Sequence, residues 1–540
     1  MDKPIVKSPQ VHLLGNIIKN ALKLNHTVTE TVSEIRKKKP TPAEVQKKTL
    51  MNLITKAQYT RFGDEYKFSE IVFAKNPVEA FTKNVPVHDY NKIYDRWWKH
   101  TLAGEPNICW PGSTKYFALS SGTSESASKR IPITNDLIRS IRKASIKQIL
   151  SLVDYDLPPE LFEKGILMIG GSTHLNNKGT YFEGDLSGIN AKKIPFWFQH
   201  FYKPGKKIAR ERDWAQKIDE IVQNAHKWDI GIVVGVPAWI QIIMERVIDH
   251  YGLNNIHDIW PNLSIYTHGG VAMEPYKKPF EKLLGRPIHY IETYLASEGF
   301  IAYQSRKDCK GMELLLDNGI FFEFVPFNEE NFDADGIIRE NPKTFTIAEV
   351  KEGEDYAILL TTNAGTWRYL IGDTVRFTSK EHSEIIITGR TKHFLSLCGE
   401  HLSVDNMTKA VRSVADQLNI SVPEFTVSGV RSGSLFGHKW YIGTPDGVGV
   451  DPVLFRDLLD KTLCEVNDDY EIERRAALKD IMVDVLPLQC FYNWMESKGK
   501  VGGQHKFPRV MKTAQLKEFT EFAEEKGYLK VDSNFHARYL

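Results

Sequence analysis

The sequence predicts an α/β protein with a large N-terminal domain and a smaller C-terminal αβ domain. Between residues 165 and 290, β-branched apolar runs alternate with helical patterns, which predicts mainly parallel strands with helices on both faces. Between residues 315 and 390, short strands follow one another with turn residues between them, which indicates an antiparallel region forming a small barrel. The chain of 540 residues is too long for one compact core.

Local signals support the individual elements. Thr41 and Glu44 form a capping-box pattern with Pro42 at the first helical position, so a helix begins there. Thr134 or Asn135 is expected to cap a second helix. In the large domain, further helices are expected near 214–225 and 239–247, and strands at 165–170, 230–236, 263–267, 288–292, 314–316, 320–325, 356–361, 374–377 and 384–388.

The pattern changes again near Thr391, where we place the boundary between domains 1–390 and 391–540. The C-terminal unit is expected to contain helices at 404–418 and 452–467 and strands at 424–430, 439–444 and 480–485.

Composition excludes several classes of protein. A formal net charge of +2 argues against nucleic-acid binding as the main activity. The five cysteines are far apart and odd in number, so reduced thiols and a cytoplasmic location are expected. The longest apolar run, 231–244, is too short to span a bilayer, and no signal-peptide pattern is seen at the N-terminus, so we expect no membrane partner. The sequence leaves the oligomeric state open.

A loop rich in hydroxyl side chains follows the strand-like run that ends at Leu119. Ser120, Ser121, Thr123 and Ser124 surround Gly122, and Lys129 follows shortly after. Hydroxyl donors, backbone N–H groups and a cation are the groups that bind a polyphosphate. No Gly-Lys-Ser/Thr follows, so this is not the common triphosphate loop. When the loop residues are considered alone, the alternative explanation is that this segment is an ordinary solvated turn.

Polar and aromatic residues also follow the predicted parallel strands. They occur in the stretches 235–239, 267–270 and 293–298. In such sheets ligands bind beyond the carboxyl ends of the strands, so these stretches are candidate site segments.

Four dispersed segments, in order, resemble the adenylate-forming enzymes, which include acyl-CoA ligases and firefly luciferase: 120–124, 294–299, 367–375 and 389–392. The chain resembles the auxin-responsive acyl-acid amido synthetase family more closely still. The segments that resemble motifs of this family are Ser120–Ser124, Tyr294–Glu298, Tyr369–Asp373, Asn467–Arg474 and Gln504–Arg509. The likeness covers about Leu53 to Arg509 and implies a large adenylate-forming domain closed by a mobile C-terminal domain.

The resemblance implies ATP and Mg²⁺ as cofactors and assigns nucleotide-binding roles. The loop Ser120–Ser124 would hold the phosphates, and Lys129 would add a positive charge. The alternative is that Lys129 is simply an exposed surface lysine. Asp373 would accept hydrogen bonds from both ribose hydroxyls; the alternative is a Gly-Asp turn. Arg390 would contact ribose or phosphate, or else lie at the domain interface. Tyr294 would stack near adenine or line the acyl pocket.

Two further residues would act directly in catalysis. Glu298 would bind Mg²⁺, since carboxylate oxygen is its preferred ligand; the alternative is a carboxylate at a helix N-terminus. Lys506 would reach the α-phosphate from the C-terminal domain, or else be a solvated lysine.

Other residues would line the substrate pockets. Thr267, His268 and Gly270 match segments near the adenine and acyl groups in relatives, although a structural histidine is the simpler explanation of His268. Trp239, Trp197 and Phe198 are candidate acyl-pocket walls, or plain core residues.

The sequence departs from the family pattern at two positions. Glu125 replaces a small residue in the phosphate loop, and Leu370 stands where plant members often carry a second Arg. The resemblance as a whole nevertheless implies an ATP-dependent ligase that joins a small carboxylic acid to an amino acid. The alternatives are an acyl-CoA ligase with a thiol acceptor and a non-catalytic nucleotide-binding scaffold.

Overall fold

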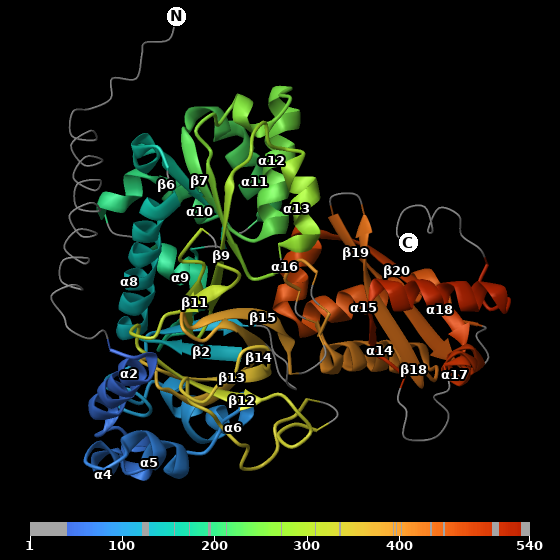
Figure 1. Ribbon diagram of the computed structural model, residues 1–540. Coiled ribbons are helices and arrows are strands. Elements are labelled where there is room, and N and C mark those ends of the chain that lie inside the picture. Colours follow the sequence, from blue (N-terminus) through green and yellow to red (C-terminus); the bar gives the residue numbers. More distant parts are fainter. Residues whose placement is uncertain are drawn as a thin grey trace, which may run out of the picture.

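The structure is a computed structural model (Figure 1). The structure describes residues 40–120, 129–155, 157–171, 173–192, 196–211, 213–271, 273–307, 309–333, 336–391, 394–395, 397–400, 402–432, 435–445, 449–498 and 507–530.

A sheet of eleven strands forms the centre of the large N-terminal part. Its strands, in order across the sheet, are β12 (Ile320–Pro326), β13 (Asp355–Thr362), β14 (Thr366–Ser379), β15 (Glu384–Arg390), β11 (Met312–Leu314), β10 (Gly299–Tyr303), β9 (His289–Ala296), β8 (Ile265–Gly269), β7 (Ile230–Val234), β3 (Gly165–Met168) and β6 (Tyr202–Lys203). The strands from β9 to β6 pair in parallel, as the alternating pattern predicts. The antiparallel strands that we placed in a small barrel continue this same sheet.

A second sheet, of four strands, lies beside it. Its order is β2 (Lys129–Ile133), β1 (Tyr116–Ser120), β5 (Phe182–Gly184) and β4 (Asn176–Asn177). The helices of the large part are α2 (Pro42–Ala57), α3 (Arg61–Glu65), α4 (Phe68–Val72), α5 (Pro77–Asn84), α6 (Tyr90–Ile93), α7 (Lys99–Leu102), α8 (Asn135–Ser151), α9 (Leu186–Lys192), α10 (Lys206–Ala209), α11 (Trp214–Asn224), α12 (Pro237–Tyr251) and α13 (Glu274–Glu281).

Helices cover both faces of the parallel strands (Figure 1). On one face, Leu152 and Tyr155, which follow α8, pack against Ile232 and Ile265 of the sheet. On the other face, α11, α12 and α13 bury Val233, Tyr266 and neighbouring residues in a larger core. Burial on both faces accounts for the continuous apolar strands seen in the sequence.

The helices α2 to α5 pack against the antiparallel end of the sheet. A buried ion pair fixes this contact: Arg368 of β14 binds Glu323 of β12 through Nη2 at 2.7 Å and donates to the carbonyl oxygens of Thr82 and Val85. The predicted capping box of α2 is present, since the Thr41 side chain accepts from the N–H of Glu44.

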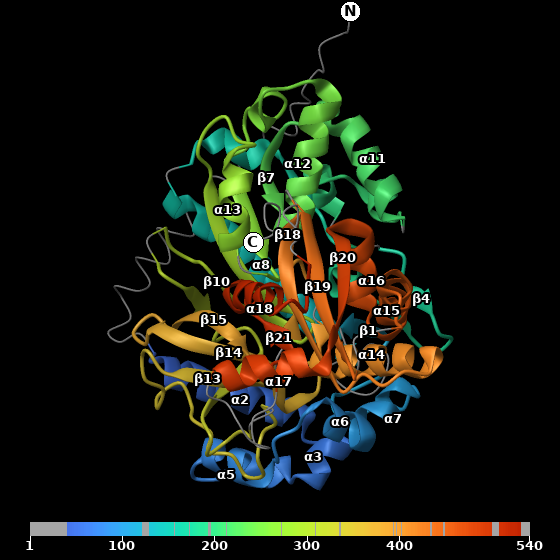
Figure 2. The same ribbon diagram turned by 90° about the vertical axis from the view of Figure 1, so that its right-hand side faces the viewer.

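The C-terminal part forms a separate four-stranded sheet with helices on both faces (Figure 2). Its order is β20 (Leu478–Pro487), β19 (Leu435–Thr444), β18 (Glu424–Ser432) and β21 (Val510–Met511), preceded by β16 (Phe394–Leu395) and β17 (Leu402–Ser403). One face packs against α14 (Val404–Leu418), α15 (Pro452–Val466) and α16 (Asp468–Ala476), and the other against α17 (Leu488–Ser497) and α18 (Thr513–Glu525). The bounds of α14 equal the predicted ones.

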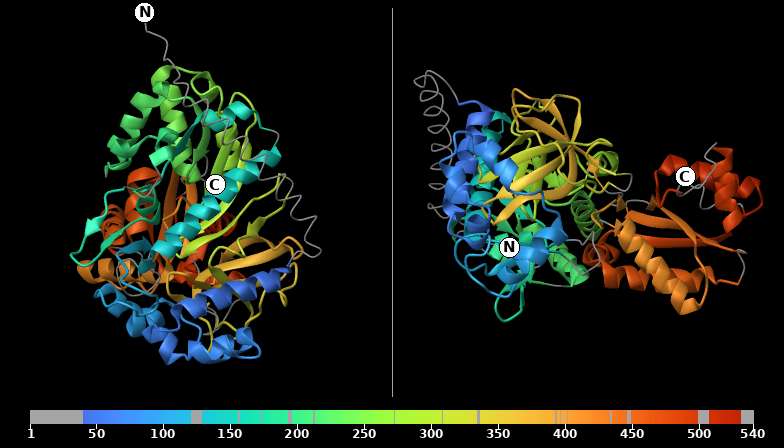
Figure 3. Two further views of the ribbon diagram at one scale, coloured as in Figure 1. Left: turned by 90° about the vertical axis from the view of Figure 1, so that its left-hand side faces the viewer. Right: turned by 90° about the horizontal axis from the view of Figure 1, so that it is seen from below.

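The two parts meet at α16, and the C-terminal part lies to one side of the large part (Figure 3). A single hydrophobic core contains residues of α12 and α13 together with residues of α14, α15 and α16. Among the described residues, no helix has the length and apolar character that crossing a bilayer requires.

Candidate active site

The ends of the hydroxyl-rich loop are fixed by a strand pair. Ser120 is the last residue of β1, and it pairs with Lys129, the first residue of β2. The loop between them therefore begins and ends at neighbouring positions of one sheet. Ser121, Gly122, Thr123, Ser124 and the unusual Glu125 lie outside the described residues.

Lys129 has a structural neighbour that the sequence did not reveal. Its ammonium group lies 5.5 Å from the centre of the Tyr90 ring, a cation–π geometry. The Tyr90 hydroxyl in turn accepts a hydrogen bond of 3.0 Å from the backbone N–H of Arg130. The Arg130 side chain binds the buried Glu183 at 2.9 Å. These contacts fix the strand that leaves the loop.

Tyr294, Asp373 and Arg390 form one hydrogen-bonded group. The Tyr294 hydroxyl donates to Asp373 Oδ2 at 2.5 Å, and Arg390 Nε forms an ion pair of 2.9 Å with Asp373 Oδ1. Asp373 and Arg390 face each other across strands β14 and β15. Asp373 thus lies within a strand, which excludes the hairpin-turn alternative. A carboxylate has about four acceptor sites, so Asp373 keeps capacity for further donors.

Gly372 gives this group its local geometry. Its φ of +96° belongs to the region that favours glycine. A Cβ atom here would lie 3.6 Å from Arg390 Nη2. The glycine of the Gly-Asp pair therefore allows the backbone conformation that β14 adopts beside the Asp373 carboxylate.

Glu298 lies in the turn between β9 and β10, at the carboxyl edge of the parallel strands. Its side chain is buried. Burial raises the pKa of Glu298 to about 7, with Lys129 lowering this pKa and Asp373 raising it. A bound cation stabilises the ionised form of a buried carboxylate strongly when a second carboxylate lies nearby. The donor chemistry of Glu298 therefore fits a hard divalent ion such as Mg²⁺.

Residues of β8 divide between the two faces of the sheet. Neighbouring residues of a strand alternate, so Thr267 and His268 point in opposite directions and do not line one pocket together. His268 lies beside the Tyr266 ring, and burial lowers the pKa of His268 to about 4, so this imidazole is neutral at pH 7. Gly270 follows the strand with φ +85°.

Trp239 contacts the C-terminal part. Its indole N–H donates to Glu473 Oε2 of α16 at 3.2 Å. Burial raises the pKa of Glu473 well above its usual range, and the nearby Glu400 raises this pKa further. Glu400 itself forms a buried ion pair with His438 at 2.9 Å. A second contact between the parts runs from the Tyr276 hydroxyl to the carbonyl of Leu397 at 2.5 Å.

The Asn467–Arg474 motif explains how α16 is held. Asn467 caps the helix by accepting from the N–H of Tyr470. The hydroxyl of Tyr470 and the guanidinium of Arg474 both bind Asp460 of α15. The motif therefore positions Glu473 beside Trp239. Sequence patterns assign no individual role to Glu473, Tyr90 or Glu183, because their partners are distant in the chain. Lys506 and the side chain of Trp197 lie outside the described residues, while Phe198 packs beside Phe201.

The described groups suit a nucleotide. The ammonium group of Lys129, the end of the loop at Ser120 and the carboxylates of Asp373 and Glu298 come together near the carboxyl ends of parallel strands. That is where such sheets bind ligands.

The arrangement of a large α/β part and a smaller αβ part is shared with solved structures of other proteins. Solved structures with this fold include a GH3.15 acyl acid amido synthetase, with TM-score 0.54, 17% identity and coverage of 88% of this chain and 92% of that chain. A 2-hydroxyisobutyryl-CoA ligase aligns with TM-score 0.55 and 13% identity over 88% of this chain and 91% of that chain.

The chain belongs to the GH3 family. The GH3 family N-terminal domain matches residues 31–220, the central domain residues 313–387 and the C-terminal domain residues 405–515.

Curated relatives match over shorter stretches. Indole-3-acetic acid-amido synthetase GH3.2 of Arabidopsis thaliana is 27% identical over 168 residues, which is 30% of each chain. Jasmonoyl–L-amino acid synthetase JAR4 of Nicotiana attenuata is 30% identical over 193 residues, covering 34% of this chain and 32% of the relative. The chain thus spans about a third of the length of these relatives.

Proposed function

We propose that this protein is an ATP-dependent acyl-acid amido synthetase. It would activate a small carboxylic acid as an acyl-adenylate and then join the acyl group to the amine of an amino acid. The observation that carries this proposal is the group Tyr294–Asp373–Arg390, which lies next to the buried Glu298 at the carboxyl edge of the sheet. Family membership and the amido synthetase relatives favour an amine as acceptor.

Asp373 is the proposed ribose-binding residue. Its two oxygens are held by Tyr294 and Arg390, so its remaining lone pairs point in fixed directions. Both ribose hydroxyls of ATP would donate to it. Because this carboxylate is oriented before the nucleotide arrives, binding costs little side-chain entropy. Tyr294 acts here as the residue that orients Asp373.

The phosphates would lie against the loop Ser120–Ser124 and Lys129. The strand pair of Ser120 and Lys129 holds both ends of that loop in place. Glu298 would hold Mg²⁺, which, when bound, neutralises phosphate charge. Lys506 is proposed to contact the α-phosphate when domain 391–540 closes over domain 1–390.

The first step needs no base, because a carboxylic acid is already ionised at neutral pH. The substrate carboxylate oxygen attacks the α-phosphorus and forms an O–P bond, while the bond from the α-phosphorus to the oxygen bridging the α- and β-phosphates breaks and pyrophosphate leaves with its electron pair. In the second step the neutral amine attacks the acyl carbon, the C–N bond forms, and AMP leaves with the bonding electron pair. One proton is released from the amine. Positioning and charge neutralisation supply the catalysis. We place the enzyme in the cytoplasm, with no nucleic-acid or membrane partner.

Acid-dependent exchange of labelled pyrophosphate into ATP tests the first step. The proposal predicts exchange with at least one small carboxylic acid, in a manner that requires Mg²⁺. Amide formation on adding amino acids would establish the acceptor. Thioester formation with coenzyme A in place of amide would identify an acyl-CoA ligase, and no exchange with any acid would identify a non-catalytic scaffold.

A further inference from the structure

Tyr90 of α6 contacts two successive residues at the start of β2, where the hydroxyl-rich loop ends. The Lys129 ammonium group lies 5.5 Å from the centre of the Tyr90 ring, and the Tyr90 hydroxyl accepts a hydrogen bond of 3.0 Å from the backbone N–H of Arg130. One side chain therefore holds both the Lys129 side chain and the backbone that follows it. The proposed nucleotide contacts do not involve Tyr90 itself.

The position of Tyr90 is fixed by strand β14, which also carries Asp373. The backbone N–H of His88, just before α6, donates to the carbonyl oxygen of Arg368 at 2.9 Å, and the N–H of Leu370 donates to the His88 carbonyl oxygen at 2.8 Å. The segment that leads into α6 is thus hydrogen-bonded to β14 shortly before Asp373. Tyr90 consequently connects the strand of the proposed ribose-binding residue with the strand that follows the proposed phosphate loop.

Aromatic packing holds the Tyr90 ring in place. Tyr90 is 8% exposed, its ring stacks on that of Tyr94 with 5.5 Å between the centroids, and the Trp98 ring packs edge-on against it at 6.0 Å. The Trp98 indole N–H donates to the carbonyl oxygen of Gly365, immediately before β14, at 3.3 Å. The ring that Lys129 contacts is therefore fixed and largely shielded from water. A cation–π contact is stronger when its partners are desolvated.

The Lys129 ammonium group also lies near the buried carboxyl group of Glu298. Burial raises the pKa of Glu298, and the nearby Lys129 lowers it. An ion pair with a carboxylate would neutralise the charge of this lysine. The Tyr90 ring attracts the cation through its quadrupole and carries no net charge, so the full positive charge of Lys129 stays available to phosphate oxygens.

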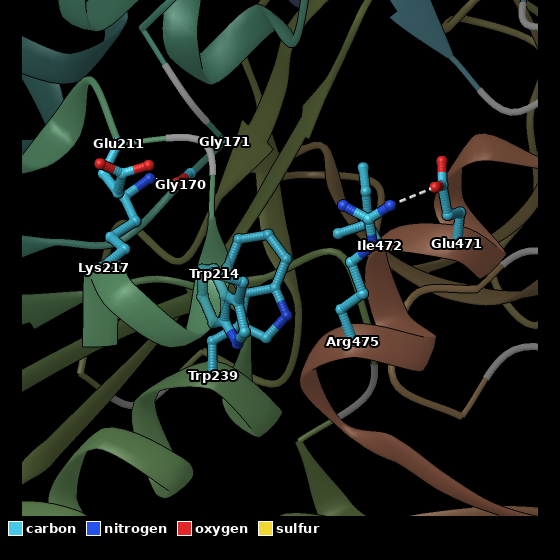
Figure 4. Close-up of a pocket in the computed structure, with 9 residues that line it drawn as sticks. All are labelled: Gly170, Gly171, Glu211, Trp214, Lys217, Trp239, Glu471, Ile472 and Arg475. Atoms are coloured by element: carbon cyan, nitrogen blue, oxygen red, sulfur yellow. Dashed lines mark hydrogen bonds and ion pairs between the residues drawn. The ribbon is translucent and has the colours of Figure 1, made fainter. Parts of the chain in front are cut away.

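Lys217 is a buried lysine of the large part, but it lies elsewhere. It lines a cavity of about 100 Å³ between the large part and α16, and its ammonium group donates to the carbonyl oxygen of Gly170 at 3.0 Å (Figure 4). Gly170 follows β3, and strands β7 and β8 separate β3 from β9, the strand that leads to Glu298. Of these two lysines, Lys129 is therefore the one placed to reach the phosphates.

We propose that Tyr90 is a positioning residue for triphosphate binding: its ring holds the Lys129 ammonium group beside the loop, and its attachment to β14 sets the spacing between this cation and Asp373. This inference rests on the proposed function. Tyr90 acts through Lys129 and does not contact the nucleotide. Its contribution should therefore be measurable for ATP and absent for adenosine, which carries the base and the ribose but no phosphate.

Fluorinated phenylalanines at position 90 test this role, because they keep the shape of the ring and weaken its attraction for a cation. Tyr90→Phe keeps the ring, so the KM for ATP in acid-dependent pyrophosphate exchange should stay within about twofold of the wild type. Mono-, di- and trifluorinated phenylalanine should then raise this KM stepwise, to about three- to thirtyfold with the trifluorinated ring. The inhibition constant of adenosine should stay constant across the series.

A double-mutant cycle tests whether Tyr90 acts through Lys129. Tyr90→Leu should raise the KM for ATP when Lys129 is present and should have no further effect in a protein that carries Lys129→Met. Tyr94→Leu is the matched control, because it removes a ring from the same aromatic cluster. It should lower the Tm and leave the ATP KM and the adenosine inhibition constant unchanged.

Three results would overturn the inference. An unchanged KM for ATP across the fluorinated series, in a protein that catalyses pyrophosphate exchange, would refute the role of Tyr90 and leave the proposed function intact. A parallel loss of adenosine binding, or equal effects of Tyr90→Leu with and without Lys129, would show that Tyr90 only supports the fold. The absence of exchange in the wild type with every acid would refute the proposed function itself. The fluorinated series keeps the test valid even where Tyr90→Leu does not fold.

Discussion

Replacing Glu298 with Gln removes a carboxyl group whose pKa burial holds at about 7, against 4.5 for an ordinary glutamate. At about 1.4 kcal/mol per pKa unit, that difference corresponds to about 3 kcal/mol of folding free energy. The cost has a defined pH window. Below about pH 4.5 the carboxyl is protonated in both the folded and the unfolded chain. Between 4.5 and 7 only the folded chain keeps the proton, so wild-type stability falls as the pH rises.

The neutral amide of the Glu298→Gln variant avoids this cost. Thermal unfolding without nucleotide or divalent cation should therefore show Glu298→Gln to be more stable than the wild type at pH 8, by up to about 3 kcal/mol. At pH 5 the difference should be small. The same variant should lose Mg²⁺-dependent pyrophosphate exchange. Higher stability with lower activity is expected of a residue kept for ligand binding at a cost to the fold.

Glu323→Gln is the matched control, because Glu323 is also a buried glutamate of the large sheet. Its carboxylate is paired with Arg368, so the substitution leaves a buried guanidinium without its partner and should destabilise by about 3–5 kcal/mol at both pH values. A Glu298→Gln protein that is less stable than the wild type at pH 8, or equally changed at both pH values, would refute the reasoning. In that case the negative charge of the Glu298 carboxylate would already be stabilised by neighbouring groups of the folded protein.

Substitutions at three further residues test the remaining contacts. Asp373→Ala should lower kcat/KM for ATP by about a hundredfold, because two hydrogen bonds to a carboxylate are lost; near-normal adenylation would refute the ribose assignment. Tyr294→Phe removes one donor to Asp373 but leaves Arg390 in place, so the KM for ATP should rise by only about two- to tenfold, and an effect as large as that of Asp373→Ala would show that Tyr294 contacts the nucleotide itself. Glu473→Gln keeps an acceptor oxygen for the Trp239 indole N–H and should change the Tm little, whereas Glu473→Leu removes that acceptor and should lower the Tm; equal losses of Tm in the two variants would show that the contact with Trp239 does not stabilise this helix.

The order of elements could be predicted because it follows from local patterns. Helix Val404–Leu418 was predicted to the residue, since Ser403 and Asn406 form its capping box and its apolar residues recur at helical spacing. The parallel strands were evident from their continuous apolar runs. Strand β14 was predicted only as 374–377, although it runs from Thr366 to Ser379. Gly372 interrupts the apolar strand pattern in the sequence. The length of β14 is set by its pairing with β13 and β15.

The contacts that make the site could not be predicted from local patterns. Tyr294 and Asp373 are separated by 79 residues, and Trp239 and Glu473 by 234. The residue types at Glu298 and Asp373 could be matched to a family motif, but their burial and mutual charge depend on how distant strands of the large sheet pack together. The burial of Lys217 gave no sequence signal, because a single lysine in an amphipathic helix is ordinarily expected to be solvated.

The central claim is that one molecule of ATP is cleaved to AMP for each amide formed. The most direct measurement is the simultaneous quantification of AMP and coupled product, by mass spectrometry, in reactions that contain a panel of small carboxylic acids and amino acids. The account predicts equal amounts of AMP and amide, with both products dependent on acid, amino acid and Mg²⁺. Formation of AMP together with a coenzyme A thioester, or release of ADP in place of AMP, would contradict it.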